Sequence, residues 1–322
     1  MREQPTIFIG LEGIDGSGKS TVQEGLVVHA KDFDAENKQI PGLAARLEER
    51  GHNVIKTCEP GEYPTGPIAL ESNLNKTGYI LHLAVERAED PFVKGILETV
   101  RFMTSEGMDC IPEDLYETLL NGEAPTGLFY DEDYQMLSDF CSFEPSIRRT
   151  VEKASLRQLI RHALVHTLDG EVLCPDATGL LFFANHLVHC TWLEKQKHAV
   201  FVSDRSKMSQ YAYSAPRGDC RVWELYKAHS RHDPDFTVLL TCDPQEAVER
   251  VVGRTKSEEK HWAGVSFMRK TQEAYLEHLD GKPHIVIDTT DLTSAETIVA
   301  ATDAVLERLS RLSHNSKYPQ LG

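Results

Sequence analysis

The segment 13–21, Gly-Ile-Asp-Gly-Ser-Gly-Lys-Ser-Thr, constrains this chain more than any other. It fits the pattern G-x-x-x-x-G-K-[ST], and it lies between a short apolar run at 6–12 and an expected helix at 21–28. Glycines let backbone N–H groups turn toward an anion, and the N-terminus of the following helix adds a favourable dipole. The segment therefore predicts a phosphate-binding loop, or P-loop, for a nucleoside triphosphate.

Each polar residue of this loop has an expected role. In such a loop Lys19 reaches the β- and γ-phosphates, and the hydroxyl of Ser20 ligates Mg²⁺. We expect the triphosphate to be bound by Gly13, Gly16, Ser17, Gly18, Lys19, Ser20 and Thr21. The loop indicates the phosphate donor and leaves the acceptor open.

Charge and cysteine content exclude several other classes of protein. The 322 residues carry a net charge of −16, which disfavours a nucleic-acid partner because a polyanion needs a basic surface. The seven cysteines are scattered without any C-x-x-C pair, which argues against a disulfide framework or a zinc site and fits a reducing compartment. No signal peptide and no apolar stretch long enough to span a bilayer are recognisable, so we expect a cytoplasmic protein without a membrane partner.

Apolar runs alternate with helical patterns along most of the chain. Strands are expected at 6–12, 52–58, 199–203, 235–242 and 284–288, and helices at 42–50, 178–196, 221–229, 244–254, 265–279 and 294–312. This alternation predicts an α/β fold with a five-stranded parallel sheet and helices on both faces.

The stretch 72–150 interrupts the alternation. It is acidic, and its apolar residues recur at helical spacing, which predicts a mainly helical insertion that buries them. We therefore expect a nucleotide kinase core formed by residues 1–71 and 151–322, with an insertion at 72–150.

Polar residues follow the predicted strands at the edge where ligands bind in such sheets. Glu59-Pro60-Gly61 follows the second strand, and Asp204-Arg205 follows the third. A carboxylate such as Asp204 can hold Mg²⁺, and a neighbouring arginine can clamp a phosphate oxygen. The alternatives are a surface ion pair for Asp204 and Arg205 and a solvated carboxylate for Glu59.

A cationic segment at about 250–262 is a candidate lid. Arg250, Arg254, Lys256 and Lys260 lie there, and phosphoryl transfer needs cations that close over the transferring group. The alternative is a solvated helix end with favourable cations at its C-terminus.

Taken together, these residues resemble the thymidylate kinases. The resemblance rests on Glu12–Thr21, Arg46–His52, Glu59-Pro60-Gly61, Leu180–Asn185, and Asp204-Arg205 with Ser209, Ala212 and Tyr213; it covers residues 5–71 and about 155–312. It implies a P-loop kinase fold and a dimeric cytosolic enzyme that moves the γ-phosphoryl group of ATP to the monophosphate dTMP, with Mg²⁺.

The resemblance also implies roles for individual residues. Lys19 and Ser20 would handle ATP and Mg²⁺, Asp15 would contact the acceptor sugar hydroxyl or organise Mg²⁺, and Asp204 would stand near the metal. Arg205 would hold the acceptor phosphate, Phe182 or Phe183 would stack on the base, and Tyr213 would lie beneath the deoxyribose, with Glu59, His186 and Ser209 completing the acceptor site. Because Gly16 stands where some members carry arginine, the catalytic arginine is expected in the lid at Arg254, with Arg250 as the alternative.

Four departures from the family pattern fall in the acceptor site. Cys58 and His186 replace arginines, Ser206 replaces an aromatic residue, and Ser214 replaces glutamine. His186 would either donate a hydrogen bond to the base or lie on the helix surface. A modified pyrimidine monophosphate or another deoxynucleotide therefore fits as well as dTMP.

Two rival functions remain at this point. A deoxynucleoside kinase would need a general base near the acceptor hydroxyl, for which Glu59 is the candidate. A nucleotide-binding regulatory protein would have a decayed acceptor site, as Cys58 and His186 would allow.

Overall fold

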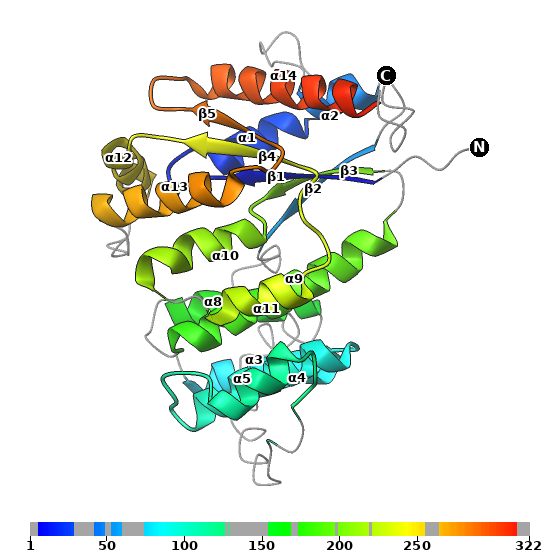
Figure 1. The fold of residues 1–322 in the computed structure, drawn as a ribbon, viewed down its shortest axis with the longest axis vertical. Helices are drawn as coiled ribbons and strands as arrows, with labels where there is room; N and C mark the ends of the chain where they lie inside the picture. Colours follow the sequence, from blue (N-terminus) through cyan, green and yellow to red (C-terminus); the bar gives the residue numbers. More distant parts are fainter. Residues whose placement is uncertain are drawn as a thin grey trace, which may run out of the picture. The chain divides into compact units, whose positions relative to one another are not determined.

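The structure is a computed structural model of the chain, and it describes residues 6–28, 42–48, 53–59, 74–125, 128, 154–168, 173–196, 199–218, 221–254 and 264–313. The chain divides into two compact units, which Figure 1 colours along the sequence. The sheet unit comprises Met1–Cys58, Glu194–Asp219 and Asp233–Gly322. The helical unit comprises Glu59–Leu193 and Cys220–His232.

A five-stranded sheet forms the centre of the sheet unit. Its strands are β1 (Ile7–Glu12), β2 (Asn53–Cys58), β3 (Ala199–Asp204), β4 (Phe236–Thr241) and β5 (His284–Asp288). They are all parallel, in the order β2-β3-β1-β4-β5. The strands β1 and β4 are mostly apolar and buried along their whole length, as expected for a sheet covered on both faces. The predicted parallel sheet is confirmed.

Helices cover both faces of this sheet (Figure 1). On one face lie α1 (Lys19–Leu26), α2 (Leu43–Glu48) and α14 (Ser294–Ser313), and on the other lie α10 (Lys207–Ser214) and α13 (Val265–Leu279). Leu26 and Val305 pack with Ile9 on the first face, and Tyr275 packs with Leu239 on the second. The helix α12 (Pro244–Arg254) and the short 3-10 helix η3 (Ala215–Arg217) complete the unit. The two apolar layers hold the carboxyl ends of β1 and β3 side by side, with Leu11 in register with Asp204.

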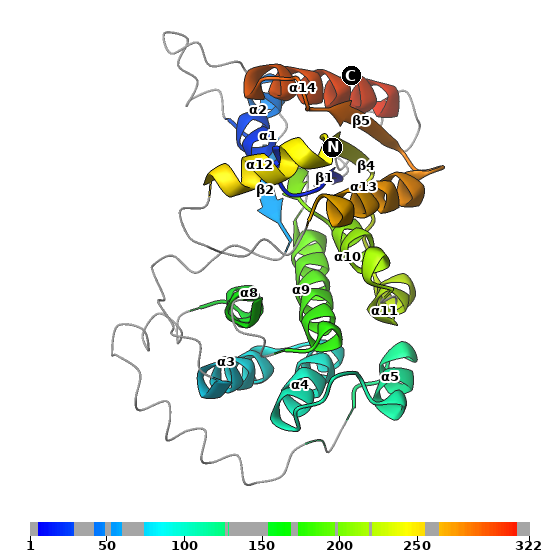
Figure 2. The ribbon, with the colours of Figure 1, turned by 90° about the vertical axis from the view of Figure 1, so that its left-hand side faces the viewer.

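The helical unit contains α3 (Leu74–Arg87), α4 (Pro91–Ser105), α5 (Glu113–Leu120), α8 (Leu156–Leu168), α9 (Pro175–Lys195, which continues two residues beyond it) and α11 (Arg221–His229). Figure 2 shows α4 between α3 and α5. The start of α4 follows from local chemistry, since Pro91 occupies the first turn and the Asp90 carboxylate accepts hydrogen bonds from the amides of Phe92 and Val93.

Helices form in the stretch 72–150, as its apolar spacing predicted, because α3, α4 and α5 lie there. The boundaries expected at 72 and 150 stay a prediction; the structure groups α8, α9 and α11 with these helices. Within the described ranges, no helix is long and apolar enough to cross a membrane.

Candidate active site

The P-loop connects β1 to α1 in the sheet unit. Gly16 and Gly18 both have left-handed backbone angles, with φ of 87° and 91°. A Cβ atom on residue 16 would overlap the carbonyl oxygen of Ala247, so only glycine fits this close approach. Gly18 is the N-cap of α1 and supplies no side-chain hydrogen bond, so the first amides of the helix remain available to an anion.

The Lys19 ammonium is folded back onto its own loop. It donates hydrogen bonds to the carbonyl oxygens of Gly13 at 2.8 Å and Ile14 at 2.9 Å. Burial lowers the pKa of Lys19 to about 8, and the nearby charge of Arg205 acts in the same direction. Lys19 is therefore a largely desolvated cation. On triphosphate binding it can replace its hydrogen bonds to neutral carbonyl oxygens with stronger ones to charged phosphate oxygens.

Ser20 and Asp204 meet where α1 begins and β3 ends. The Ser20 hydroxyl donates a 2.7 Å hydrogen bond to Oδ2 of Asp204. The other carboxylate oxygen, Oδ1, is buried and has no hydrogen-bond partner within the described part of the chain. A hydroxyl beside a carboxylate with a vacant oxygen is a donor set that suits Mg²⁺.

Asp15, Arg205 and Tyr213 form a second cluster beside the loop. The Arg205 guanidinium pairs with the Asp15 carboxylate and lies 5.1 Å from the centre of the Tyr213 ring. The Tyr213 hydroxyl accepts a 3.1 Å hydrogen bond from the Asp15 amide. Partial burial alone would raise the pKa of Asp15, but the charges of Arg205 and Lys19 hold it at about 2. Asp15 is therefore a carboxylate that a phosphate could displace from Arg205.

The hydroxyl of Ser209 is engaged within the protein. It donates a 2.7 Å hydrogen bond to Glu12 and lies 2.8 Å from the Tyr275 hydroxyl. The hydroxyl connects α10 to β1 and α13, and the acceptor-binding role expected for Ser209 stays a prediction.

The structure describes the side chain of only one of the two candidate lid arginines, Arg250. The Arg250 Nη2 donates to the carbonyl oxygens of Thr289 at 3.2 Å and Thr290 at 2.8 Å, and its Nε donates to Glu246. These contacts give Arg250 a structural role, because they connect α12 to the segment that follows β5. The side chain of Arg254 lies outside the described residues, as do Lys256 and Lys260.

A cluster in the helical unit surrounds Glu59. Nδ1 of His186 donates to Glu59 Oε1 at 3.0 Å, and Nδ1 of His189 donates to the same oxygen at 2.7 Å. Nε2 of His186 lies 2.8 Å from the Ser230 hydroxyl. The Glu59 side chain is 9% exposed and the two histidines are at most 1% exposed. The surface position considered for His186 and the solvated position considered for Glu59 are therefore wrong.

The charge states in this cluster follow from the pairing. Burial alone would lower the pKa of His186, but the Glu59 carboxylate outweighs it and raises the pKa to about 10. Burial alone would raise the pKa of Glu59, but the charge and hydrogen bonds of the two histidines hold it well below its usual range. Burial lowers the pKa of His189. The cluster thus holds one imidazolium, one carboxylate and one neutral imidazole at neutral pH.

The two aromatic candidates for base stacking differ in burial. Phe183 is fully buried and packs on Tyr226 at 4.8 Å between ring centres, with Phe92 and His229 around it. Phe183 is therefore part of the core of the helical unit. Phe182 is half-buried and remains the candidate for stacking on a base.

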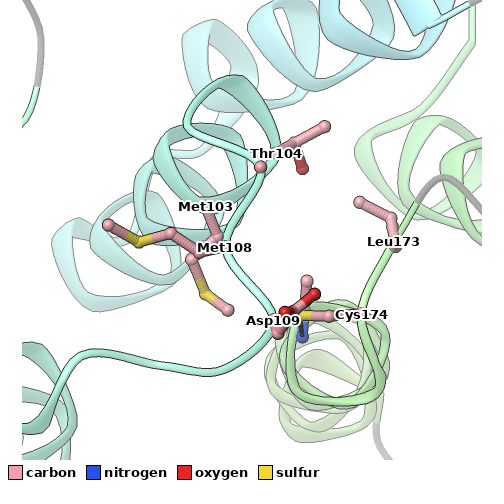
Figure 3. A pocket seen from close by; sticks show the side chains of 8 residues that line it. Met103, Thr104, Met108, Asp109, Leu173 and Cys174 are labelled. Carbon is pink, nitrogen blue, oxygen red and sulfur yellow. Dashed lines mark hydrogen bonds between the residues drawn. The ribbon is translucent and has the colours of Figure 1, made fainter.

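A cavity of about 240 Å³ in the helical unit lies apart from the predicted site residues. Figure 3 shows Met103 and Met108 on one side of it and Leu173 on the other. None of the predicted site residues lines it. It adds nothing to the donor chemistry of the sheet unit.

Comparison with known proteins decides the family. A family model described as "Thymidylate kinase" matches residues 137–298, which is half of the chain. The chain belongs to the thymidylate kinase family. The P-loop precedes the matched residues, so the loop and the family match are independent observations.

Relatives in the thymidylate kinase family are distant. A probable thymidylate kinase of Methanocorpusculum labreanum is 28% identical over 149 residues, covering 42% of this chain and 73% of that protein. The thymidylate kinase of Bifidobacterium longum is 28% identical over 170 residues, covering 48% and 79%. The solved thymidylate kinase of Candida albicans aligns over 95% of this chain and 93% of that chain, with 15% identity and a TM-score of 0.44.

The sheet unit brings together six of the predicted site residues, three with expected tasks toward ATP and Mg²⁺ and three with expected tasks that include the acceptor: Lys19, Ser20 and Asp204, and Asp15, Arg205 and Tyr213. The contacts of Glu12 and Ser230 were not anticipated, because they depend on tertiary packing. His189 lies three residues after His186, and that spacing places both rings on one face of α9.

Proposed function

We propose that this thymidylate kinase family member transfers the γ-phosphoryl group of ATP to a deoxynucleoside monophosphate, with dTMP or a modified pyrimidine monophosphate as acceptor. The observation that carries this proposal is the juxtaposition of the P-loop with Asp204 and Arg205 at the carboxyl ends of β1 and β3. It combines a cation for the donor phosphates with a second cation for an acceptor phosphate.

The residues of the sheet unit have separate tasks in this reaction. Lys19 exchanges the carbonyls of Gly13 and Ile14 for the β- and γ-phosphate oxygens of ATP. Arg205 exchanges Asp15 for the acceptor phosphate and aligns its oxygen with the γ-phosphorus. Ser20 and Asp204 would hold Mg²⁺, which neutralises charge on the transferring group when bound. The protein supplies positioning and charge, and forms no covalent intermediate.

The state of Glu59 argues against a deoxynucleoside kinase. That activity needs a general base with a pKa near neutrality. Glu59 has its pKa lowered by two histidines that donate to its carboxylate, so it is a weak base. The intact donor cluster likewise favours an enzyme over a regulatory protein that merely binds nucleotide.

His186 was expected to contact the base. Both of its ring nitrogens are engaged, one with Glu59 and one with Ser230. The proposal therefore names the acceptor by class, and Phe182 and Tyr213 are the residues proposed to contact its base and sugar. The homodimer and the cytoplasmic location that the family resemblance implies stay predictions.

The experiment is a phosphotransfer assay with ATP and Mg²⁺ against a panel of nucleosides and nucleoside monophosphates. ADP formation only with deoxypyrimidine monophosphates supports the proposal. Phosphorylation of free nucleosides would assign the rival kinase activity, and ATP binding without any transfer would assign the regulatory role. The Lys19→Ala variant is the background control, because it lacks the donor cation.

A further inference from the structure

We propose that Glu12 is a positioning residue whose buried carboxylate holds the peptide between Arg205 and Ser206, and thereby presents the Arg205 guanidinium to the acceptor phosphate. The assignment of that phosphate to Arg205 rests on the proposed function. The hold of Glu12 on the peptide does not depend on it, and the two are tested separately below.

The contacts of Glu12 converge on the segment that follows β3. Glu12 is the last residue of β1 and is fully buried. Its Oε1 accepts hydrogen bonds of 2.6 Å from both the amide and the hydroxyl of Ser206. Its Oε2 accepts a 2.7 Å bond from the hydroxyl of Ser209. One carboxylate therefore binds three donors on the chain that carries Arg205.

The backbone at Arg205 needs such a hold. Its φ is +72°, and Arg205 is the only non-glycine residue with positive φ in the described ranges. L-residues avoid this region unless surrounding contacts enforce it. The peptides on both sides of Arg205 are fixed: its amide donates to Leu11 at 2.9 Å, and its carbonyl accepts from the Ser203 hydroxyl at 2.6 Å. Glu12 fixes the next amide, which belongs to Ser206.

A carboxylate suits this position better than an amide would. The amide and hydroxyl of Ser206 and the hydroxyl of Ser209 all donate to Glu12, and an ionised carboxylate is a pure acceptor. Glutamine would turn an N–H₂ group toward one of them. The Ser209 hydroxyl also contacts Tyr275, which extends the support to α13.

The charge of Glu12 changes near neutral pH. Burial raises its pKa to about 7, although hydrogen bonds from Ser206 and Ser209 and the charge of Arg205 act in the opposite direction. The other titratable groups that act on it are Lys19 on α1 and Tyr275 on α13. A protonated Glu12 has to donate one hydrogen bond, so it loses one of its three donors. The hold on the Arg205–Ser206 peptide should therefore weaken below about pH 7.

The functional test is Glu12→Gln in the phosphotransfer assay. We expect the KM for the acceptor to rise about tenfold, the effect of one lost charge-assisted hydrogen bond, while the KM for ATP changes little. In the wild type, acceptor kcat/KM should fall more steeply below about pH 7 than in Glu12→Gln, in which only the ionisation of the acceptor phosphate near pH ~6 remains. An unchanged acceptor KM, or an equal rise in the KM for ATP, would overturn the inference.

Ser206→Ala and Thr293→Ala form a matched pair. Each removes a hydroxyl that accepts an amide at a helix N-terminus, from Met208 at 3.3 Å and from Glu296 at 3.3 Å. Only Ser206 also donates to Glu12. We expect both variants to lose stability, and only Ser206→Ala to raise the acceptor KM. If the acceptor KM changed equally in both variants, Ser206 would have only a structural role, and the same would hold for Glu12.

Hydrogen exchange separates this inference from the proposed function. The amide of Ser206 should exchange faster in Glu12→Gln than in the wild type, and Thr293→Ala should leave it unchanged. If no acceptor is phosphorylated, the proposed function fails while faster exchange still supports the hold on this peptide. Unchanged exchange at Ser206 overturns the inference whatever the acceptor is.

Discussion

Nδ1 of His186 donates a 3.0 Å hydrogen bond to a carboxylate oxygen of Glu59, across 127 positions of sequence and within a buried site. His186 also reaches Ser230, so a single imidazolium connects Glu59, α9 and the residue after α11. A buried charge pair of this kind stabilises only while both charges are present. The stability of the helical unit should therefore depend on pH.

The sign of that dependence follows from the raised pKa of His186. The group has a pKa of 6.5 when unfolded and about 10 when folded, so the folded state binds its proton more tightly. The stabilisation is complete below pH 6.5 and is lost as the pH rises through 10. We expect the free energy of unfolding to fall by about 3–5 kcal/mol across this range, the cost of breaking a buried pair. Denaturant unfolding measured at several pH values tests this. In His186→Gln the free energy of unfolding should no longer fall with rising pH in this range, whereas His189→Gln should keep the decrease.

Lys19→Ala should reduce kcat by about 100- to 1000-fold or more, as expected for removal of a group that contacts developing charge. It should leave the fold intact, because Lys19 is a desolvated cation with a pKa lowered to about 8. Steady-state kinetics and thermal unfolding of the same sample check both parts. Full activity in this variant would reject the donor site.

Asp204→Asn keeps the shape of the side chain and its contact with Ser20 but removes the charge. We expect the Mg²⁺ concentration for half-maximal activity to rise about tenfold, because a hard cation prefers an anionic oxygen ligand. The control is Asp303→Asn, an exposed carboxylate paired with Arg46 at 3.1 Å. A Mg²⁺ titration at fixed ATP measures both, and equal curves for Asp204→Asn and the wild type would remove Asp204 from the metal site.

Substitution of Arg250 should mainly lower stability, and substitution of Arg254 should mainly lower kcat. Arg250→Ala removes the donors to the carbonyls of Thr289 and Thr290, so it should cost about 1–3 kcal/mol of stability. Arg254→Ala should lower kcat more than it weakens ATP binding, as expected for a lid residue that contacts the transferring group. Denaturant unfolding and steady-state kinetics on both variants test this, and an unchanged kcat in Arg254→Ala would reassign the lid.

The strands were predictable because the sheet is buried. The apolar runs at 6–12, 199–203 and 235–242 correspond to β1, β3 and β4 within one residue at each end, because a strand covered on both faces is mostly apolar. The helix α10 was not predicted, although Met208, Tyr211 and Ala212 recur at helical spacing and pack in one apolar cluster. Its start is set by Ser206, which caps it and contacts Glu12.

The donor residues were predictable from one local pattern, because the loop carries its own geometry. The Glu59 cluster was not predictable, because it joins residues that only tertiary packing brings together. The same reason applies to Phe183, which is adjacent to Phe182 in the sequence but whose ring is fully buried in the core.

The backbones of Gly16 and Ala247 approach so closely that the P-loop packs directly against α12. Because no side chain separates the two backbones, we expect a displacement of the loop on nucleotide binding to shift the helix that ends at Arg254. A larger residue at position 16 would force the backbones of the P-loop and α12 apart. We therefore expect ATP, by occupying the loop, to change the orientation of α12 and with it the position of the carboxyl end of this helix.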